Sequence, residues 1–205
     1  MEDSSTLTAT TPGGKSVLLR SDGTWVFQSS SARPITSADG FRKMPWGASR
    51  AEVIASENRD DYEDTDSFLA FTAVIAGLPC SIIYVFIRDA LVRGKLSFTI
   101  QHANDNDFWD DFEALKNMLT KKYGLPDDDQ TIWKDDTYKD SPNERGMAVS
   151  CGGLVGLVAW DLEETQFSLV LAGDNFEIDL SIHYKSKFLG HLEDEYIENL
   201  ALEEL

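Results

Sequence analysis

Short β-prone runs separated by turn residues make up most of this sequence, and they restrict the possible folds severely. Runs rich in Ile, Val, Phe and Tyr cover 68–75, 80–87, 91–102, 146–151, 154–161, 166–172 and 176–185. Such residues favour pleated, half-buried strands. The last run alternates, with Phe176, Ile178, Leu180, Ile182 and Tyr184 on one side and polar residues on the other. This pattern predicts an antiparallel sheet with one face on a core.

One segment in the middle of the chain carries a helical pattern instead. Its apolar residues recur three or four positions apart: Phe108, Phe112, Leu115, Leu119 and Tyr123. Acidic residues crowd the first turn and two lysines close the last one, which complements the helix dipole. Gly124 and Pro126 then prevent continuation. The sequence predicts an α+β fold with antiparallel sheet and one main packed helix.

Two further helices are expected, one near the start of the fold and one at the end of the chain. Ser49 followed three residues later by Glu52 forms a capping box, which predicts a short helix over 50–57. Leucines and Tyr196 at helical spacing predict an acidic amphipathic tail helix within 188–205, of marginal length without tertiary support.

Turn signals and composition divide the chain. Pro12-Gly13-Gly14 and Asp22-Gly23 punctuate three short runs, which predicts a β-meander. A segment rich in Ser, Ala and Thr follows, as is typical of a linker. The predicted organisation is a meander appendage at 1–30, a linker at 31–40, an α+β domain at 41–187 and a tail helix at 188–205.

The charge balance limits the kinds of partner. Asp and Glu number 36 against 18 Lys and Arg, giving a net charge of −18. A surface this negative disfavours nucleic acid and anionic lipid and suits a basic protein partner. The longest apolar run, Ile82–Ile87, is too short to span a bilayer. The first residues lack the features of a secretory signal, so the chain as it stands is expected to be cytoplasmic, or periplasmic if a signal was removed.

No pattern of reactive or ligating residues predicts an enzyme. His102, His183 and His191 form no zinc motif, and the acidic segment from Asn104 to Asp111 fails the spacing of a calcium-binding loop. We therefore expect no catalytic residue, no metal site and no cofactor. Cys80 and Cys151 are expected to be small buried hydrophobes, although a disulfide stays open in an exported protein.

Three residues are the candidates for contact with a partner. Trp109 lies off the apolar stripe of the main helix, so it is expected to be exposed. His102 stands at the junction between a strand and this helix, and Trp25 lies in the meander. Exposed aromatic side chains are frequent anchors in protein interfaces.

The region from Phe41 to Lys187 resembles a family of uncharacterised bacterial α+β proteins, many of them exported or lipid-anchored. The matching residues include Phe41-Arg42, Trp46-Gly47-x-Ser49, Glu52-Val53, Lys122-Tyr123-Gly124-x-Pro126, Trp133, Tyr138-Lys139-Asp140, Trp160 and Gly173-Asp174-Asn175. The preceding Asp22-Gly23-Thr24-Trp25 is similar to a hairpin unit of many bacterial proteins. A looser similarity is to small outer-membrane-assembly lipoprotein domains, which are interaction modules. The resemblance implies sheet and helices, with no known activity.

Three hypotheses about function remain open on this basis. The first is a non-enzymatic binding protein that recognises a protein partner, with an acidic surface suited to a basic one. The second is an envelope-associated module, periplasmic or lipoprotein-like. The third is a hydrolase with a cryptic site, which would need a pocket joining His102 to two acids from separate elements.

Overall fold

The computed structural model describes residues 7–10, 16–19, 25–27 and 40–203, and the chain forms two compact units, Met1–Thr36 and Ser37–Leu205. In the first unit β1 (Leu7–Thr10), β2 (Ser16–Leu19) and β3 (Trp25–Phe27) pair antiparallel in chain order, as a meander does. The predicted linker at 31–40 lies outside the described residues apart from Gly40.

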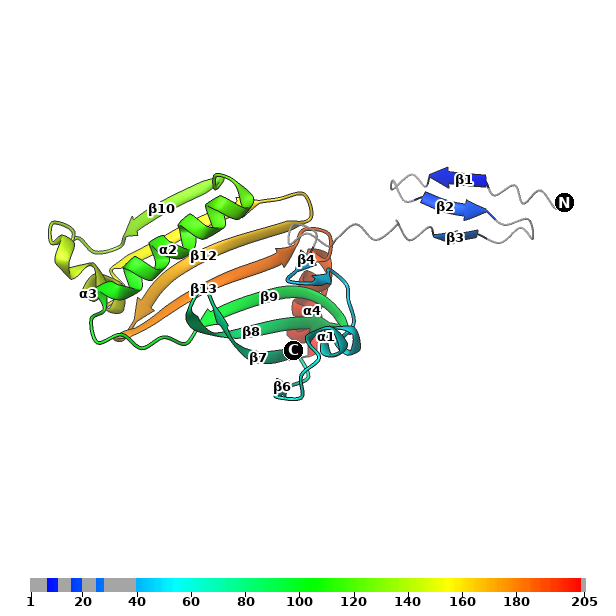
Figure 1. Cartoon of the computed structure of the whole chain (residues 1–205), viewed down its shortest axis with the longest axis horizontal. Helices are drawn as coiled ribbons and strands as arrows, with labels where there is room; N and C mark the ends of the chain where they lie inside the picture. The colour runs from blue at the N-terminus through cyan, green and yellow to red at the C-terminus, as the bar shows by residue number, and fades with distance from the viewer. Residues whose placement is uncertain (1–6, 11–15, 20–24, 28–39, 204–205) are drawn as a thin grey trace. The chain divides into compact units, whose positions relative to one another are not determined.

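The second unit is built on an eight-stranded sheet in the order β10-β11-β12-β13-β9-β8-β7-β6 (Figure 1). All seven pairings are antiparallel. The strands are β6 (Tyr62–Asp64), β7 (Phe68–Ile75), β8 (Leu78–Ile87), β9 (Ala90–Phe98), β10 (Asp128–Trp133), β11 (Leu154–Asp161), β12 (Thr165–Asp174) and β13 (Glu177–Ser186). The predicted class, α+β with an antiparallel sheet and one main helix, is confirmed.

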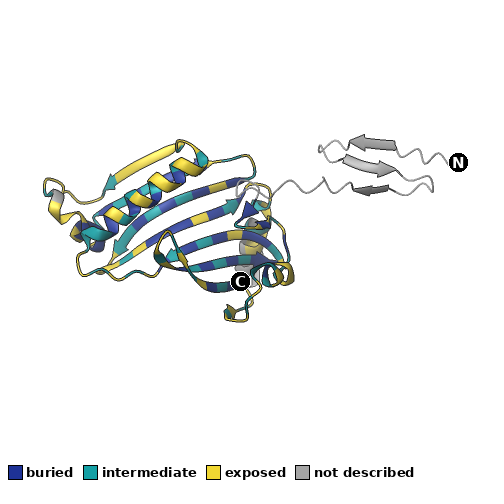
Figure 2. Cartoon of the chain, in the orientation of Figure 1, coloured by how far each residue is buried: buried dark blue, intermediate teal, exposed yellow. Residues whose placement is uncertain are grey.

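One face of this sheet carries most of the helical structure. The elements beside the sheet are β4 (Gly40–Phe41), β5 (Met44–Pro45), α1 (Arg50–Glu57), α2 (Asn106–Tyr123), the 3-10 turn η1 (Pro142–Glu144), α3 (Arg145–Ser150) and α4 (Gly190–Glu203). α2 crosses the sheet over β11 to β13 with its predicted stripe turned inward, and alternate strand residues beneath it are buried (Figure 2).

Two glycines in the strands let aromatic rings reach the sheet. A Cβ atom at Gly156 would lie 2.8 Å from Cζ of Phe112 on α2. A Cβ atom at Gly94 would lie 2.2 Å from Cγ of Phe41, which packs edge-on against Tyr84. Close packing of this kind needs a residue without a side chain. The two glycines therefore fix where α2 and β4 sit on the sheet.

The short helix α1 begins as the sequence predicts. The Ser49 side chain accepts a hydrogen bond from the backbone of Glu52, and the Glu52 carboxylate accepts one from the backbone of Ser49, so the capping box is confirmed. The entry to this helix is tied to β9, because the Gly47 amide donates to the Leu91 carbonyl at 2.9 Å. Trp46 adds a hydrogen bond from Nε1 to Oγ1 of Thr165 at 2.8 Å.

One local prediction is wrong. Residues 146–151 were expected as a strand, but Arg145–Ser150 is α3, which follows directly from η1 and packs so closely on the start of α2 that only Gly146 fits there. A run of six residues is too short for periodicity to distinguish helix from strand. The acidic segments β6 and β10 form the two edges of the sheet.

The opposite face of the sheet carries α4 alone among the described helices. Arg93 and Lys185 occupy strand positions that point away from α2, and both form ion pairs with Glu193 of α4. In Figure 1 α4 accordingly lies behind the strands and α2 in front. The predicted tail helix thus exists and docks at one corner of an otherwise open sheet face.

Candidate functional site

The open face presents two rows of side chains that cross four neighbouring strands. The register of β12, β13, β9 and β8 aligns Ser168, His183, Lys95 and Ile83 in one row. The same pairings align Gln166, Lys185, Arg93 and Val85 in the next row. Because strand residues alternate between faces, all eight side chains point away from α2.

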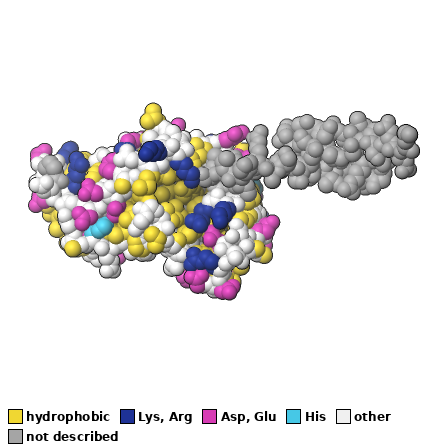
Figure 3. Space-filling view, viewed as in Figure 1, with side chains coloured by type: hydrophobic (Ala, Val, Ile, Leu, Met, Phe, Trp, Pro, Cys, Tyr) yellow, Lys and Arg dark blue, Asp and Glu magenta, His cyan; other side chains and the backbone are white. Residues whose placement is uncertain are grey.

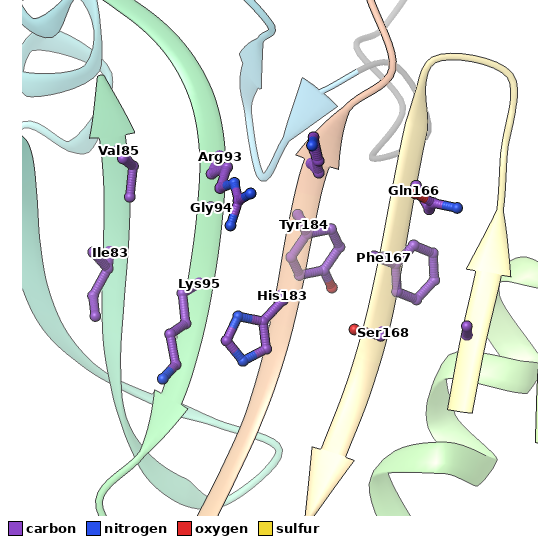
Figure 4. A pocket seen from close by; sticks show the side chains of 12 residues that line it. Ile83, Val85, Arg93, Gly94, Lys95, Gln166, Phe167, Ser168, His183 and Tyr184 are labelled. Carbon is purple, nitrogen blue, oxygen red and sulfur yellow. The ribbon is translucent and has the colours of Figure 1, made fainter. Parts of the chain in front are cut away.

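These rows surround a hollow of about 420 Å³ in the middle of the open face (Figure 4). Its described lining includes Arg93, Lys95, Lys185 and His183, and no Asp or Glu is among the twelve residues that line it. This is unexpected in a chain whose acids outnumber its bases two to one. We call the site formed by these four residues the basic hollow.

Carboxylates from just outside the hollow balance part of this charge. Glu193 of α4 lies 2.6 Å from Nε of Arg93 and 3.3 Å from Nζ of Lys185, so a single carboxylate bridges two cations. Its side chain is only 16% exposed. Asp179 lies 3.6 Å from Nζ of Lys95. Two cations of the hollow, Arg93 and Lys185, therefore already pair with a carboxylate that the chain itself supplies.

A hydrogen-bonded series along β13 consists of Asp179, Ser181 and His183. It has the residue types of a catalytic triad but lacks the hydrogen-bond directions of one. The buried hydroxyl of Ser181 donates to Oδ2 of Asp179 at 2.8 Å, and Nε2 of His183 lies 3.0 Å from the same Oγ. Since the hydroxyl has one proton, Nε2 of the neutral imidazole is the donor in the second contact. A nucleophilic serine needs the reverse, with its proton directed at a base. This geometry does not activate Ser181.

The environment of His183 keeps its ring neutral. Partial burial among the strands lowers the pKa of His183 below its ordinary value, the positive charge of Lys95 lowers it further, and Asp179 opposes the change. A neutral ring leaves Nδ1 as an acceptor beside three permanent cations. The hollow thus keeps its donors on Arg93, Lys95 and Lys185 at neutral pH.

An apolar strip adjoins the basic hollow on the same face. It consists of alternate residues of β10, β11 and β12, all partly exposed: Ile132, Val155, Leu157, Val170 and Ala172. Cross-strand pairing places Ile132 opposite Val155 and Leu157 opposite Val170. The open face therefore combines cationic groups with apolar area that no described helix covers.

The other face also has apolar surface, but of a different kind. Figure 3 shows apolar side chains gathered in the middle of the face that carries α2, with acidic side chains around its periphery. The partly buried residues there, such as Ile75, Leu78, Ile100 and Ile178, pack against the core of the unit. This surface continues the core, whereas the basic hollow brings polar groups together in a depression, which is more typical of a binding site.

The predicted exposure of Trp109 is wrong. Its side chain is buried, stacks at a tilt on Phe112 and lies under the guanidinium of Arg145, 5.3 Å from the ring centre. The stripe of α2 is wider than the sequence pattern suggested, because α3 covers the helix from a second side. Trp109 is therefore a packing residue between two helices.

The two other predicted contact residues have different outcomes. His102 is half-buried, with Nε2 donating to Oδ2 of Asp111 at 2.7 Å and its ring edge-on to Phe108. These contacts order the start of α2 and bring no second acid from another element to the imidazole. Trp25 begins β3, but its side chain lies outside the described residues.

The cysteines and acids form no second site in the described part of the chain. Cys80 is buried, and burial raises the pKa of its thiol to about 11. Cys151 is exposed, so the expectation of two buried cysteines is wrong for it, and both are free. No group of three or more His, Cys, Asp or Glu among the described residues could hold a metal ion. No described helix is both long and apolar enough to cross a membrane.

Searches for related proteins add nothing to this description. No protein-family model, no curated protein and no solved structure matches the chain. The resemblance carried by Trp46-Gly47 and the residues around it stays a prediction.

The sequence contains a partial signal for the basic hollow. Arg93-x-Lys95 and His183-x-Lys185 each place cations or imidazole on the polar side of an alternating strand. What the sequence does not reveal is that β9 and β13, far apart in the chain, are direct neighbours. Only this pairing gathers the four side chains.

Proposed function

We propose that this protein is a non-enzymatic binding module that takes a protein partner on the open face of its eight-stranded sheet. One observation carries the proposal: the sheet face opposite α1, α2 and α3 presents the basic hollow beside the apolar strip. A hollow with polar groups inside and apolar area beside it supplies both orientation and buried area to a partner. The hydrogen bonding of Ser181 argues for binding over catalysis.

Affinity capture with matched surface variants tests this proposal. The immobilised chain is compared with Leu157→Glu, which places a carboxylate on the apolar strip, and with Met118→Glu on the outer side of α2. Both replaced side chains are at least partly exposed, so both variants are expected to fold. We expect the wild type and Met118→Glu to retain the same protein from a native lysate and Leu157→Glu to lose it.

Circular dichroism and the unfolding midpoint serve as the folding control for both variants. Retention of the partner by Leu157→Glu, or capture of no protein by the wild type, would contradict the proposal. Loss of the partner by Met118→Glu alone would place the binding surface on the α2 side instead.

A further inference from the structure

We propose that the basic hollow is a carboxylate-binding site for an acidic segment of the partner, and that α4 acts as its internal competitor through Glu193. The inference rests on the proposed function, because both use the open face of the sheet. It goes further by naming the chemistry of the partner and a means of regulation.

The chemistry of the partner follows from the composition of the hollow. Arg93, Lys95 and Lys185 supply the permanent charges, and the twelve lining residues include no acid. Arg and Lys bind carboxylates through charge-assisted hydrogen bonds. The net charge of −18 favours a basic partner in general, but the charges inside this depression favour an acidic group.

Glu193 shows how such a group binds. Its carboxylate already bridges Arg93 and Lys185, with one oxygen directed to each cation. α4 carries further acids, and Glu195 pairs with Arg88 at the β8–β9 turn, outside the lining of the hollow. An acidic helix of this chain thus already pairs with two of the cations that line the hollow, and an acidic segment of another protein presents the same groups.

Competition between the two acidic segments is expected because the internal contacts are weak. Arg93 and Lys185 are 46% and 41% exposed, although Glu193 is only 16% exposed, and ion pairs with cations that water still reaches contribute little net stability. Lys95 lines the hollow, and its carboxylate partner is Asp179 of β13, 3.6 Å away, so an incoming carboxylate can approach Lys95 before Glu193 is displaced. Displacement of Glu193 then frees the remaining two cations.

A labelled hexaglutamate peptide measures this binding by fluorescence anisotropy on the full chain. Roughly 0.15 M salt limits long-range repulsion by the acidic protein, since the screening length is then about 8 Å. We expect hexaglutamate to bind, hexalysine not to bind at the hollow, and Lys95→Gln to weaken hexaglutamate binding. Glu193→Gln, which removes the pairs with both Arg93 and Lys185, should tighten it about two- to fivefold, the range of weak ion pairs with partly exposed cations.

Glu195→Gln is the matched control, because it removes the same charge from the same helix without touching the hollow. It should leave the affinity for hexaglutamate near that of the wild type. Equal affinities for Glu193→Gln and Glu195→Gln would overturn the role of α4. Absence of hexaglutamate binding in the wild type and in Glu193→Gln would overturn the carboxylate site, while loss of the captured partner in Leu157→Glu would still support the proposed function.

Discussion

At the scale of single residues, the hairpin turns of the large sheet show where the backbone is strained. The β7–β8, β8–β9 and β12–β13 turns each contain two residues with positive φ: Ala76-Gly77, Arg88-Asp89 and Asn175-Phe176. Glycine is the usual second residue of such a turn. Asp89 departs from this preference but accepts a hydrogen bond from the Arg50 amide at 3.0 Å. The Phe176 amide donates to the Ser150 carbonyl at 2.9 Å, a bond that does not depend on the side chain, which is 71% exposed.

Replacement of Phe176 by glycine should stabilise the protein. Phe176 has a φ of 66°, in the left-handed region. This conformation destabilises the folded state by roughly 1–2 kcal/mol for a residue with a Cβ, whereas glycine adopts it freely. We expect the free energy of unfolding in urea to rise by about 1 kcal/mol. Asp89→Gly at the equivalent turn position is the control, and it should gain less because the bond to Arg50 is lost. A lower stability of Phe176→Gly would show that the ring makes contacts that outweigh the strain.

His183 should make stability depend on pH in one direction. Its pKa is lowered in the folded state, mainly by burial and then by Lys95, so the unfolded chain binds the proton more readily. The contribution of His183 to the free energy of unfolding is therefore fully present above the pKa of the unfolded chain, about 6.5. It is lost as the pH falls below that value. Between pH 7.5 and 5.5 we expect the stability of the wild type to decline more than that of His183→Gln, measured by urea unfolding at constant salt.

The comparison with His183→Gln isolates this effect from the many carboxylates that titrate in both proteins. Parallel stability curves for the two proteins would contradict the assigned direction of the pKa change.

At the scale of secondary-structure elements, two contacts between an aromatic ring and a glycine set the positions of β4 and α2. The side chains of Phe41 and Phe112 are at most 2% exposed. Each ring fills the space that a side chain at the strand glycine beneath it, Gly94 or Gly156, would otherwise occupy. The elements outside the sheet are thus placed by shape as well as by hydrophobicity.

Gly94→Ala should destabilise the protein because the added methyl group would overlap the ring of Phe41. Overpacking of a core typically costs about 1–3 kcal/mol, and we expect a loss in this range by urea unfolding. Gly190→Ala is the control, because its Cβ would meet the nearest atom, Cε of Lys185, at an ordinary 3.5 Å. A loss in Gly190→Ala as large as that in Gly94→Ala would disprove the explanation by steric overlap.

Elements with a strong local pattern were predictable from the sequence. The capping box located α1, the apolar stripe located α2, and alternation located most of β11 to β13. The bounds of α3 and of the edge strand β10 were not predictable, because tertiary contacts and sheet pairing determine the secondary structure of such short or polar segments. The burial of Trp109 depends on α3, so the error in one element produced the error in the candidate site.

The basic hollow was unpredictable for a related reason. Its four residues come from β9 and β13, and their proximity depends on strand order. Net charge, which the sequence does provide, describes the average surface and gives no information about a local depression of opposite sign.

At the scale of the whole molecule, the core residues that the structure describes in the larger unit lie between Phe41 and Tyr184. The residues up to Thr36 form a compact unit of their own. Stability of the sheet and its helices should therefore not require the first 36 residues.

A chain that begins at Ser37 should unfold at the same temperature as the full chain, measured by the circular dichroism of the larger unit. The control is a chain that begins at Met44, which also lacks Phe41 and should unfold at a lower temperature because the space above Gly94 is left empty. A lower midpoint for the chain beginning at Ser37 would indicate that the two units stabilise one another.

The connection between β13 and α4 is only three residues long, Lys187 to Leu189. A group held on so short a tether has an effective concentration on the order of millimolar or higher near its site. That concentration does not change when the protein is diluted, so dilution cannot release Glu193 from Arg93 and Lys185. For a site of the kind inferred above, only a partner with several acidic groups, or one present in excess, would open the corner of the sheet that α4 occupies.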